Sequence, residues 1–317
     1  MNKRSKAALR SCLAPLRRRA ASAYVAGPRI DDALLACHTL RARGRAGAVG
    51  FWNRGGDEPD HVMHTYLAAV DALSRSGLDA YLSIKAPALG YSPELIAKLL
   101  ERARSAAVRV HFDSLSPESA ERTLALIAGA TQDGHQPGIT LPARWRRSLG
   151  DADAAAELGV GVRVVKGQWP DPDPPEQDQR AGFMAVVEAL AGRARWVAVA
   201  THDEALARQA LGRLRAAGTP CELELLFGLP AAPAARAADE LSAPVRVYLP
   251  YGNATVPYCL AEARKDARIL GWLLQDLLRG RRKGRKELSD RLGPNRLPLG
   301  LANAESLGPP SGSRASA

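Results

Sequence analysis

A short apolar run that ends in two cations carries the clearest chemical signal in this sequence. Residues 160–169 read Val-Gly-Val-Arg-Val-Val-Lys-Gly-Gln-Trp, and their β-branched side chains predict a buried strand over 161–166. Burying a cation is costly unless an anion or a polar group answers it, so Arg163 and Lys166 each require a partner. Gly167 lets the backbone approach a ligand closely. The pattern favours an anion or cofactor site, and a structural salt bridge is the alternative.

Polar and ionisable side chains recur at the ends of the other expected strands, whereas the strand centres are apolar. The C-terminal ends of parallel barrel strands form one face, and the active sites of such barrels lie on it. His202 taken alone is equally well explained as an ordinary, internally satisfied side chain. The complete set predicts a site, and it consists of Lys85, Asp113, Arg163, Lys166, Thr201, His202, Glu224, Tyr248 and Tyr251.

The residue types in this set exclude several kinds of chemistry. The sequence offers no HxH or HxxxE metal cluster, no GxSxG nucleophile turn and no phosphate P-loop, so we expect no bound metal. The four cysteines are scattered without a CxxC motif, and we expect reduced thiols in a cytoplasmic protein. Cations combined with aromatic hydroxyls favour a large anionic, aromatic ligand. A flavin dinucleotide meets both requirements.

Strand and helix signals alternate along most of the chain. The alternation predicts parallel strands with right-handed crossovers, and eight such units fit a closed α/β barrel of the (β/α)₈ TIM type. No GxGxxG follows the first strand, which argues against a Rossmann fold. The expected strands are 46–52, 79–85, 108–113, 138–141, 161–166, 196–201, 222–226 and 245–249. Helices are expected at 30–43, 59–75, 92–107, 145–158, 203–217, 232–241 and 256–278, with one more beginning at 116 and another ending near 192.

These elements belong to one predicted domain with a different kind of segment at each end. We expect the barrel to span 26–280, after a basic, loosely helical extension over 1–25. The basic tail over 281–317 is rich in Pro, Gly and Ser, cannot bury much apolar surface and is expected to be disordered. With 317 residues, 46% of them hydrophobic, the chain can form one large core.

The net charge of +11 raises the question of an anionic partner. Much of the basic excess lies near the ends of the chain and is not interleaved with aromatic residues, so we expect no nucleic-acid binding. Peripheral attraction to the inner membrane surface is an open alternative. No run reaches about 18 apolar residues, and we identify neither a membrane span nor a secretory signal.

Four motifs occur in the same order as similar motifs of the proline dehydrogenase family. Arg-Val-Val-Lys-Gly-Gln-Trp at 163–169 is similar to the family's Arg-Leu-Val-Lys-Gly-Ala-Tyr, and Ala-Thr-His-Asp at 200–203 resembles its Ala-Thr-His-Asn/Asp. Glu-Leu-Glu-Leu-Leu-Phe-Gly at 222–228 resembles its Glu-Phe-Gln-Met-Leu-Tyr-Gly. Val-Arg-Val-Tyr-Leu-Pro-Tyr-Gly at 245–252 resembles its last strand, and the resemblance as a whole covers roughly 26–278.

The resemblance implies an FAD-containing (β/α)₈ barrel that oxidises L-proline to pyrroline-5-carboxylate and passes electrons to a quinone or another acceptor. It places Arg163 at the N5 edge of the flavin, with Lys85, Asp113 and Tyr258 as the other catalytic residues. The residues implied in holding the FAD are Arg163, Val165, Lys166, Gly167, Thr201, His202 and Glu224. Those implied in contacting the substrate are Tyr248, Tyr258, Glu262 and Arg264.

The sequence departs from the family pattern where the substrate carboxylate is held. The family's last helix carries Tyr-x-x-Arg-Arg-x-x-Glu, and its paired arginines grip that carboxylate. Ala261 and Glu262 stand at the two arginine positions here. A glutamate repels a carboxylate that a bidentate arginine clamp would attract, so we expect an amine or imino substrate other than proline. Replacement of the clamp by Arg264 or Arg268, further along the same helix, is the alternative.

A second departure concerns the cofactor. Two glutamines that contact the flavin in the family correspond to Pro142 and Glu224 in this chain, and the family's Tyr after Lys-Gly-Ala corresponds to Trp169. These differences leave open a flavin-free barrel that binds a ligand or a partner without redox turnover.

Overall fold

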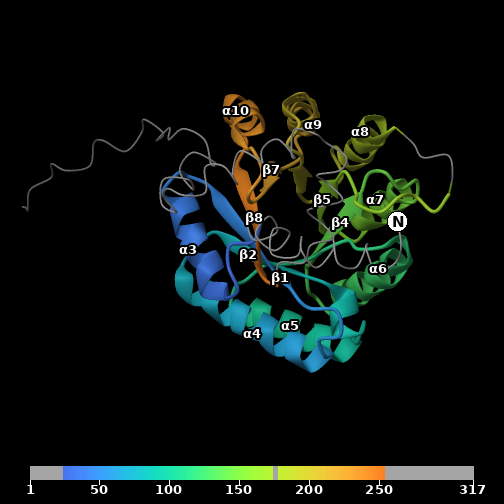
Figure 1. Cartoon of the computed structure of the whole chain (residues 1–317). Coiled ribbons are helices and arrows are strands. Elements are labelled where there is room, and N and C mark those ends of the chain that lie inside the picture. Colours follow the sequence, from blue (N-terminus) through green and yellow to red (C-terminus); the bar gives the residue numbers. More distant parts are fainter. Residues whose placement is uncertain (1–23, 174–177, 254–317) are drawn as a thin grey trace, which may run out of the picture.

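The computed structural model describes residues 24–173 and 178–253, which form a closed barrel of eight parallel strands surrounded by helices (Figure 1). Each strand pairs with the next one along the chain, and β1 closes the barrel by pairing with β8. The strands are β1 (Ala46–Trp52), β2 (Ala80–Ile84), β3 (Val110–Phe112), β4 (Gly138–Pro142), β5 (Gly161–Val165), β6 (Val197–Ala200), β7 (Cys221–Leu226) and β8 (Val245–Gly252). The predicted (β/α)₈ TIM-type barrel is confirmed.

The helices form an outer layer around the barrel (Figure 1). One of them, α3, precedes β1 in the chain and packs on the outer side of β1 and β8. A short 3₁₀ helix, η1 (Ala86–Leu89), follows β2. The described α-helices are α3 (Ile30–Arg41), α4 (Pro59–Ser76), α5 (Pro93–Ser105), α6 (Pro117–Gln132), α7 (Ser148–Glu157), α8 (Gln179–Leu190), α9 (Glu204–Ala216) and α10 (Ala232–Glu240).

Local sequence signals account for several helix ends. Pro93 and Pro117 occupy the first helical position of α5 and α6, where a missing backbone N–H costs nothing. The Ser92 hydroxyl accepts a hydrogen bond from the backbone N–H of Leu95 and so caps α5. α4 ends at Gly77, which adopts φ +60°, a left-handed conformation that favours glycine.

α7 begins at Ser148, three residues later than its spacing predicts. The indole N–H of Trp145 donates to the backbone carbonyl of Trp169 over 2.9 Å. The Ser148 hydroxyl donates to the carbonyl of Pro142 over 2.7 Å. These bonds hold the segment after β4 in a turn, so a tertiary contact overrides the helical pattern.

Glycines on the inward faces of the strands make room for large polar side chains. A Cβ at Gly50 would overlap the hydroxyl of Tyr248, and one at Gly138 would overlap the ring of His111. Alternate residues of the same strands point outward, and one of them, Val49, is fully buried under the helices. The apolar core therefore lies between strands and helices, while polar side chains fill the inside of the barrel.

Some predictions fall on residues outside the described ranges. They are most of the extension over 1–25, of which 1–23 are outside the described ranges, the helix over 256–278 and the tail over 281–317, so the domain boundaries remain predictions. Within the part of the chain that the structure describes, no helix is both long enough and apolar enough to cross a bilayer.

Candidate functional site

Arg163 is the centre of a polar cluster inside the barrel, at the level where β5 ends. Its Nη1 donates to Oδ1 of Asp113 over 2.7 Å, and its Nη2 donates to the hydroxyl of Tyr81 over 2.8 Å. Its Nε lies 2.7 Å from Oε1 of Glu224, an ion-pair contact without hydrogen-bond alignment. The residue is only 4% exposed. The charge of Arg163 is therefore balanced inside the barrel, by one carboxylate from β7 and one from the residue after β3.

The two carboxylates are themselves hydrogen-bonded. Asp113 accepts from the hydroxyl of Ser83 over 2.6 Å and from that of Tyr248 over 2.9 Å. Glu224 accepts from the hydroxyl of Tyr81. β2, β5, β7 and β8, together with the residue after β3, thus meet in one network. Such a network is stabilising only when every member is satisfied.

Burial and charge act against each other on these groups. Burial disfavours the guanidinium of Arg163, but Glu224 and Asp113 outweigh that effect and hold its pKa well above the usual range. Burial raises the pKa of Glu224, an effect that Arg163 and the Tyr81 hydroxyl oppose. Burial also raises the pKa of Tyr81 and Tyr248 well above that of free tyrosine, so both phenols are neutral hydrogen-bond donors at physiological pH.

Lys85 lies at the edge of this cluster. Its ammonium donates to the backbone carbonyl of Phe51 over 2.6 Å. Burial lowers the pKa of Lys85, and the charge of Asp113 opposes that shift. A lysine in this setting loses its proton more readily than an exposed one, because burial makes its charged form less stable.

Thr201 and His202 hold the loops after β6 and β7 together. The backbone N–H of Leu226 donates to Nε2 of His202 over 2.9 Å, which leaves Nδ1 to donate to the carbonyl of Pro230 over 2.9 Å. Burial lowers the pKa of His202, and the bond to Pro230 opposes the shift. Thr201 accepts a hydrogen bond from the backbone N–H of Asp203, the N-cap of α9. Both side chains are thus engaged with the protein's own backbone.

Lys166 and its neighbours are different, because they are partly or fully exposed at the end of β5. Lys166 is exposed and has no hydrogen-bond or ion-pair partner among the described residues. Gly167 follows with φ +91°, and a Cβ there would press on Pro142 and Arg144. Val165 is half-buried beside them. Trp169 is 46% exposed, so a cation and an indole both lie at the surface of the described part of the chain here.

Sequence reasoning missed three members of the cluster, Tyr81, Ser83 and Thr140. The hydroxyl of Thr140 accepts from Nη1 of Arg163 over 3.2 Å. Tyr81 and Ser83 alternate with apolar residues along β2, so they share the inward face with Lys85. That alternation could have identified Tyr81 and Ser83 as inward-facing residues. It is weak evidence, because hydroxyl side chains are also common on exposed strand faces.

A second buried ion pair lies near the opposite, N-terminal end of the strands. Nε of Arg246 donates to Oε1 of Glu222 over 2.8 Å, and its Nη1 donates to the carbonyl of Gly47 over 2.7 Å. The guanidinium carbon lies 4.9 Å from the ring centre of Tyr81, whose hydroxyl end reaches the Arg163 cluster. Polar contacts therefore continue through the length of the barrel.

The remaining predicted residues, Tyr258, Glu262 and Arg264, lie outside the described ranges. Within those ranges no group of three or more His, Cys, Asp or Glu side chains could hold a metal ion. The described donors fit an FAD in part. Lys166 offers a free ammonium for a phosphate, whereas the donors of Arg163 and His202 are directed at groups of the protein itself.

Comparisons with known proteins place these features in context. No protein-family model matches the chain. A Deinococcus radiodurans protein named proline dehydrogenase is 26% identical over 287 residues, which cover 82% of this chain and 90% of that protein.

Solved structures of proline utilization A (PutA) share the fold. The protein from Bdellovibrio bacteriovorus, inactivated by N-propargylglycine, aligns with a TM-score of 0.65 and 18% identity over 86% of this chain. The one from Corynebacterium freiburgense aligns with a TM-score of 0.64 and 17% identity over 83% of this chain. The alignments cover 35% and 32% of those longer chains, so this chain spans about a third of each. The comparisons confirm the resemblance to the proline dehydrogenase family that the sequence motifs indicate.

Proposed function

We propose that this protein is an FAD-dependent oxidoreductase of the proline dehydrogenase type. It would oxidise the C–N bond of proline or, in better agreement with its sequence, of a related amine or imino acid. The observation that carries the proposal is the gathering of Lys85, Asp113, Arg163 and Tyr248 at the C-terminal ends of the strands. The 26% identity to a named proline dehydrogenase over 90% of its length supports the same activity.

The chemistry assigns different tasks to these residues. FAD, when bound, supplies the acceptor for the hydride that leaves the carbon next to the amine nitrogen. Lys166 would contact the pyrophosphate of the cofactor. Lys85 and Asp113 would position the substrate amine, which must be unprotonated before it gives up the hydride. A quinone or another acceptor would then take the electrons.

One observation favours a second candidate, a flavin-free barrel that binds a ligand or partner without turnover. All the bonds of Arg163 run to side chains of the barrel, and both ring nitrogens of His202 bond to backbone groups. The hydrogen-bonding groups of these two residues therefore find partners within the protein, without a cofactor. The absorption spectrum of the purified full chain separates the two candidates, because only a bound flavin produces a band in the blue.

The substrate proposal rests on Ala261 and Glu262, which replace the family's two arginines. A carboxylate that meets a methyl group and an anion is poorly bound, so an amine without a carboxylate is the better substrate. Anaerobic mixing of the flavin-loaded protein with pyrrolidine and with L-proline tests this. We expect faster flavin bleaching by pyrrolidine. Rapid bleaching by millimolar L-proline would contradict the substrate proposal and would direct attention to Arg264.

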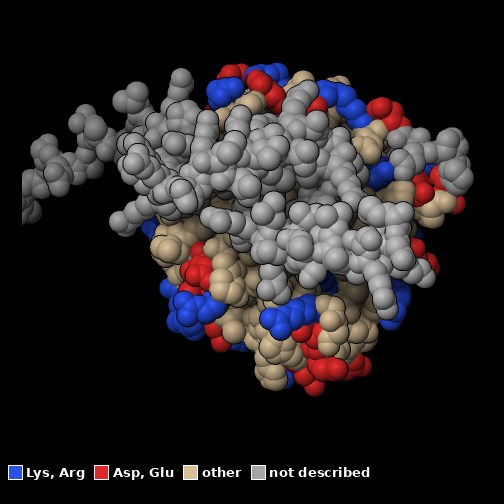
Figure 2. Space-filling model, viewed as in Figure 1, with Lys and Arg blue, Asp and Glu red and all other residues tan. Residues whose placement is uncertain are grey.

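We further propose a cytoplasmic location, without nucleic-acid binding. Figure 2 shows basic and acidic side chains interspersed over the described part of the visible face. Ion pairs such as Arg180–Asp203 and Arg213–Glu188 join α8 to α9 and its N-cap. Peripheral association with an anionic membrane remains an alternative. Sedimentation with vesicles of anionic and of neutral lipid decides between the two.

A further inference from the structure

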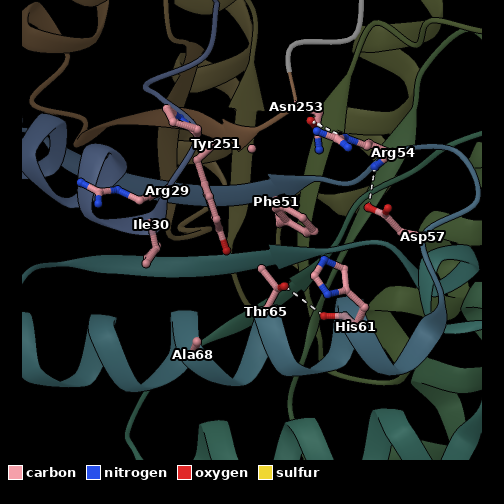
Figure 3. Close-up of a pocket in the computed structure, with 12 residues that line it drawn as sticks. Arg29, Ile30, Phe51, Arg54, Asp57, His61, Thr65, Ala68, Tyr251 and Asn253 are labelled. Carbon is pink, nitrogen blue, oxygen red and sulfur yellow. Dashed lines mark hydrogen bonds between the residues drawn. The ribbon is translucent and has the colours of Figure 1, made fainter.

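A cavity of about 470 Å³ lies outside the barrel, between the ends of β1 and β8 and the helices α3 and α4 (Figure 3). It is separate from the Arg163 cluster because it opens on the opposite side of the strands. Phe51 on β1 and Tyr251 on β8 are register partners. Side chains alternate between the two faces of a strand, and Gly50 and Tyr248 both lie on the inward face. Phe51 is one residue from Gly50, while Tyr251 is three residues from Tyr248. Both side chains therefore point away from the barrel interior.

The inner wall of the cavity is aromatic and apolar. The ring centroids of Phe51 and Tyr251 lie 5.5 Å apart, and both residues are buried. Ile30 of α3 and Ala68 of α4 line the same space. A flat, apolar ring would find contacts here with aromatic faces and with aliphatic side chains, as ligand pockets of this size commonly provide.

The hydroxyl of Tyr251 has no hydrogen-bond partner among the described residues, although the residue is only 2% exposed. Burial raises its pKa, so the hydroxyl stays protonated and can donate or accept. Figure 3 shows this hydroxyl directed toward Thr65 and Ala68 of α4, within the cavity. Buried polar groups are rarely left unsatisfied, so this hydroxyl keeps the capacity for one hydrogen bond that the described residues do not supply.

A cation without an acidic partner lies at the other side of the cavity. Nε of Arg54 donates to Oδ1 of Asn253 over 2.8 Å, and the nearby carboxylate of Asp57 is bonded to the backbone N–H of Arg54. The guanidinium itself makes no ion pair with any described carboxylate. His61 adds an exposed imidazole to the same rim (Figure 3). These donors suit an anionic group.

We propose that this cavity binds a small aromatic carboxylate with a second polar substituent. The carboxylate would pair with Arg54, the ring would pack on Phe51 and Tyr251, and the substituent would bond to the Tyr251 hydroxyl. This site is distinct from the strand-end cluster, so its occupant need not be a substrate of the proposed oxidoreductase.

The probe is 4-hydroxybenzoate, titrated calorimetrically into the full chain. We expect saturable binding, with weaker binding of the uncharged 4-hydroxybenzamide. Arg54→Gln should weaken 4-hydroxybenzoate binding about 10- to 100-fold, the value of one charge-assisted bond. Arg75→Gln, at the far end of α4 and outside the cavity, is the matched control and should bind as the wild type does.

Tyr251→Phe removes only the hydroxyl. It should weaken 4-hydroxybenzoate about 2- to 10-fold and leave benzoate unchanged, since benzoate has no group for that hydroxyl. The variant should keep the wild-type melting temperature, because the hydroxyl has no described partner to lose. The proposal is overturned by absence of saturable binding to the wild type at about 10 mM probe. Equal affinity for the amide, or equal binding by Arg54→Gln and Arg75→Gln, would overturn it as well.

Discussion

Nε of Arg163 lies 2.7 Å from Oε1 of Glu224, so that the cation of β5 meets an anion of β7 inside the barrel. Asp113 contacts the same guanidinium from the other side, at 2.7 Å. One cation is thus shared between two carboxylates, and all three side chains are largely buried. Breaking such a buried arrangement is costly, because the charges left behind have no water to stabilise them.

Arg163→Met should lower the free energy of unfolding by about 3–5 kcal/mol, since it leaves both carboxylates without their cation. Glu224→Gln should cost less, because Arg163 keeps Asp113 as its partner. The double variant should be more stable than Arg163→Met alone, since it removes one of the two unpaired anions. Urea unfolding of the three variants at pH 7 measures these differences. Simple addition of the two single losses would show that the charges are not coupled.

Gly50→Ala should destabilise the protein by about 1–3 kcal/mol through overpacking, because the added Cβ overlaps the hydroxyl of Tyr248. It should also weaken the bond from Tyr248 to Asp113. Gly129→Ala is the matched control, since Gly129 lies within α6 with nothing near its missing Cβ. That change should stabilise by about 0.5–1 kcal/mol, the usual gain in a helix interior. Thermal unfolding of both variants measures these changes. A change of stability in the same direction for both variants would contradict the prediction.

Stability should fall as the pH drops below about 6.5, and His202 should contribute to the fall. The unfolded chain protonates His202 near pH 6.5, whereas burial lowers the pKa in the folded protein. The unfolded state therefore binds more protons below that pH, and stability is lost by up to about 1.4 kcal/mol per pH unit. His111 has the same sign of shift through burial and adds to the effect.

His202→Gln tests this assignment, because an amide can both donate and accept but does not titrate. Unfolding free energies at pH 7.5, 6.5 and 5.5 should show a shallower dependence in the variant than in the wild type. A residual slope from His111 is expected. Identical slopes for the two proteins would mean that His202 takes up its proton equally well in the folded state.

Lys166→Ala should weaken FAD binding about 10- to 100-fold, the loss of one charged hydrogen bond worth about 1.5–3 kcal/mol. The ammonium is exposed and unpartnered among the described residues, so its removal should not affect folding. Lys98→Ala on the exposed face of α5 removes the same charge elsewhere and serves as the control. Flavin retained after desalting, measured by absorbance, should separate the two variants. Equal retention would remove Lys166 from the site.

Much of the fold follows from local patterns in the sequence. The run 46–52 is predicted and observed with the same bounds, because β-strand periodicity and the flanking turns agree there. The start of α7 is misplaced by three residues, because a hydrogen bond from Trp145 to Trp169, 24 residues further along the chain, holds a turn in place of a helical one. Such contacts are absent from any local window of sequence.

The sequence by itself determined that Arg163 lies on a buried strand and that a buried cation needs a partner. The same expectation for Lys166 is wrong, because the structure places Lys166 in solvent, without a partner among the described residues. Closure of the barrel brings Asp113 and Glu224 to Arg163 from segments far apart in the chain, whereas Lys166, the residue after β5, is exposed to solvent. The cost of burying a charge means that a buried cation needs a partner, and this need can be read from the local sequence. The identity of the partner depends on how the barrel closes, which brings together residues far apart in the chain and cannot be read from local spacing.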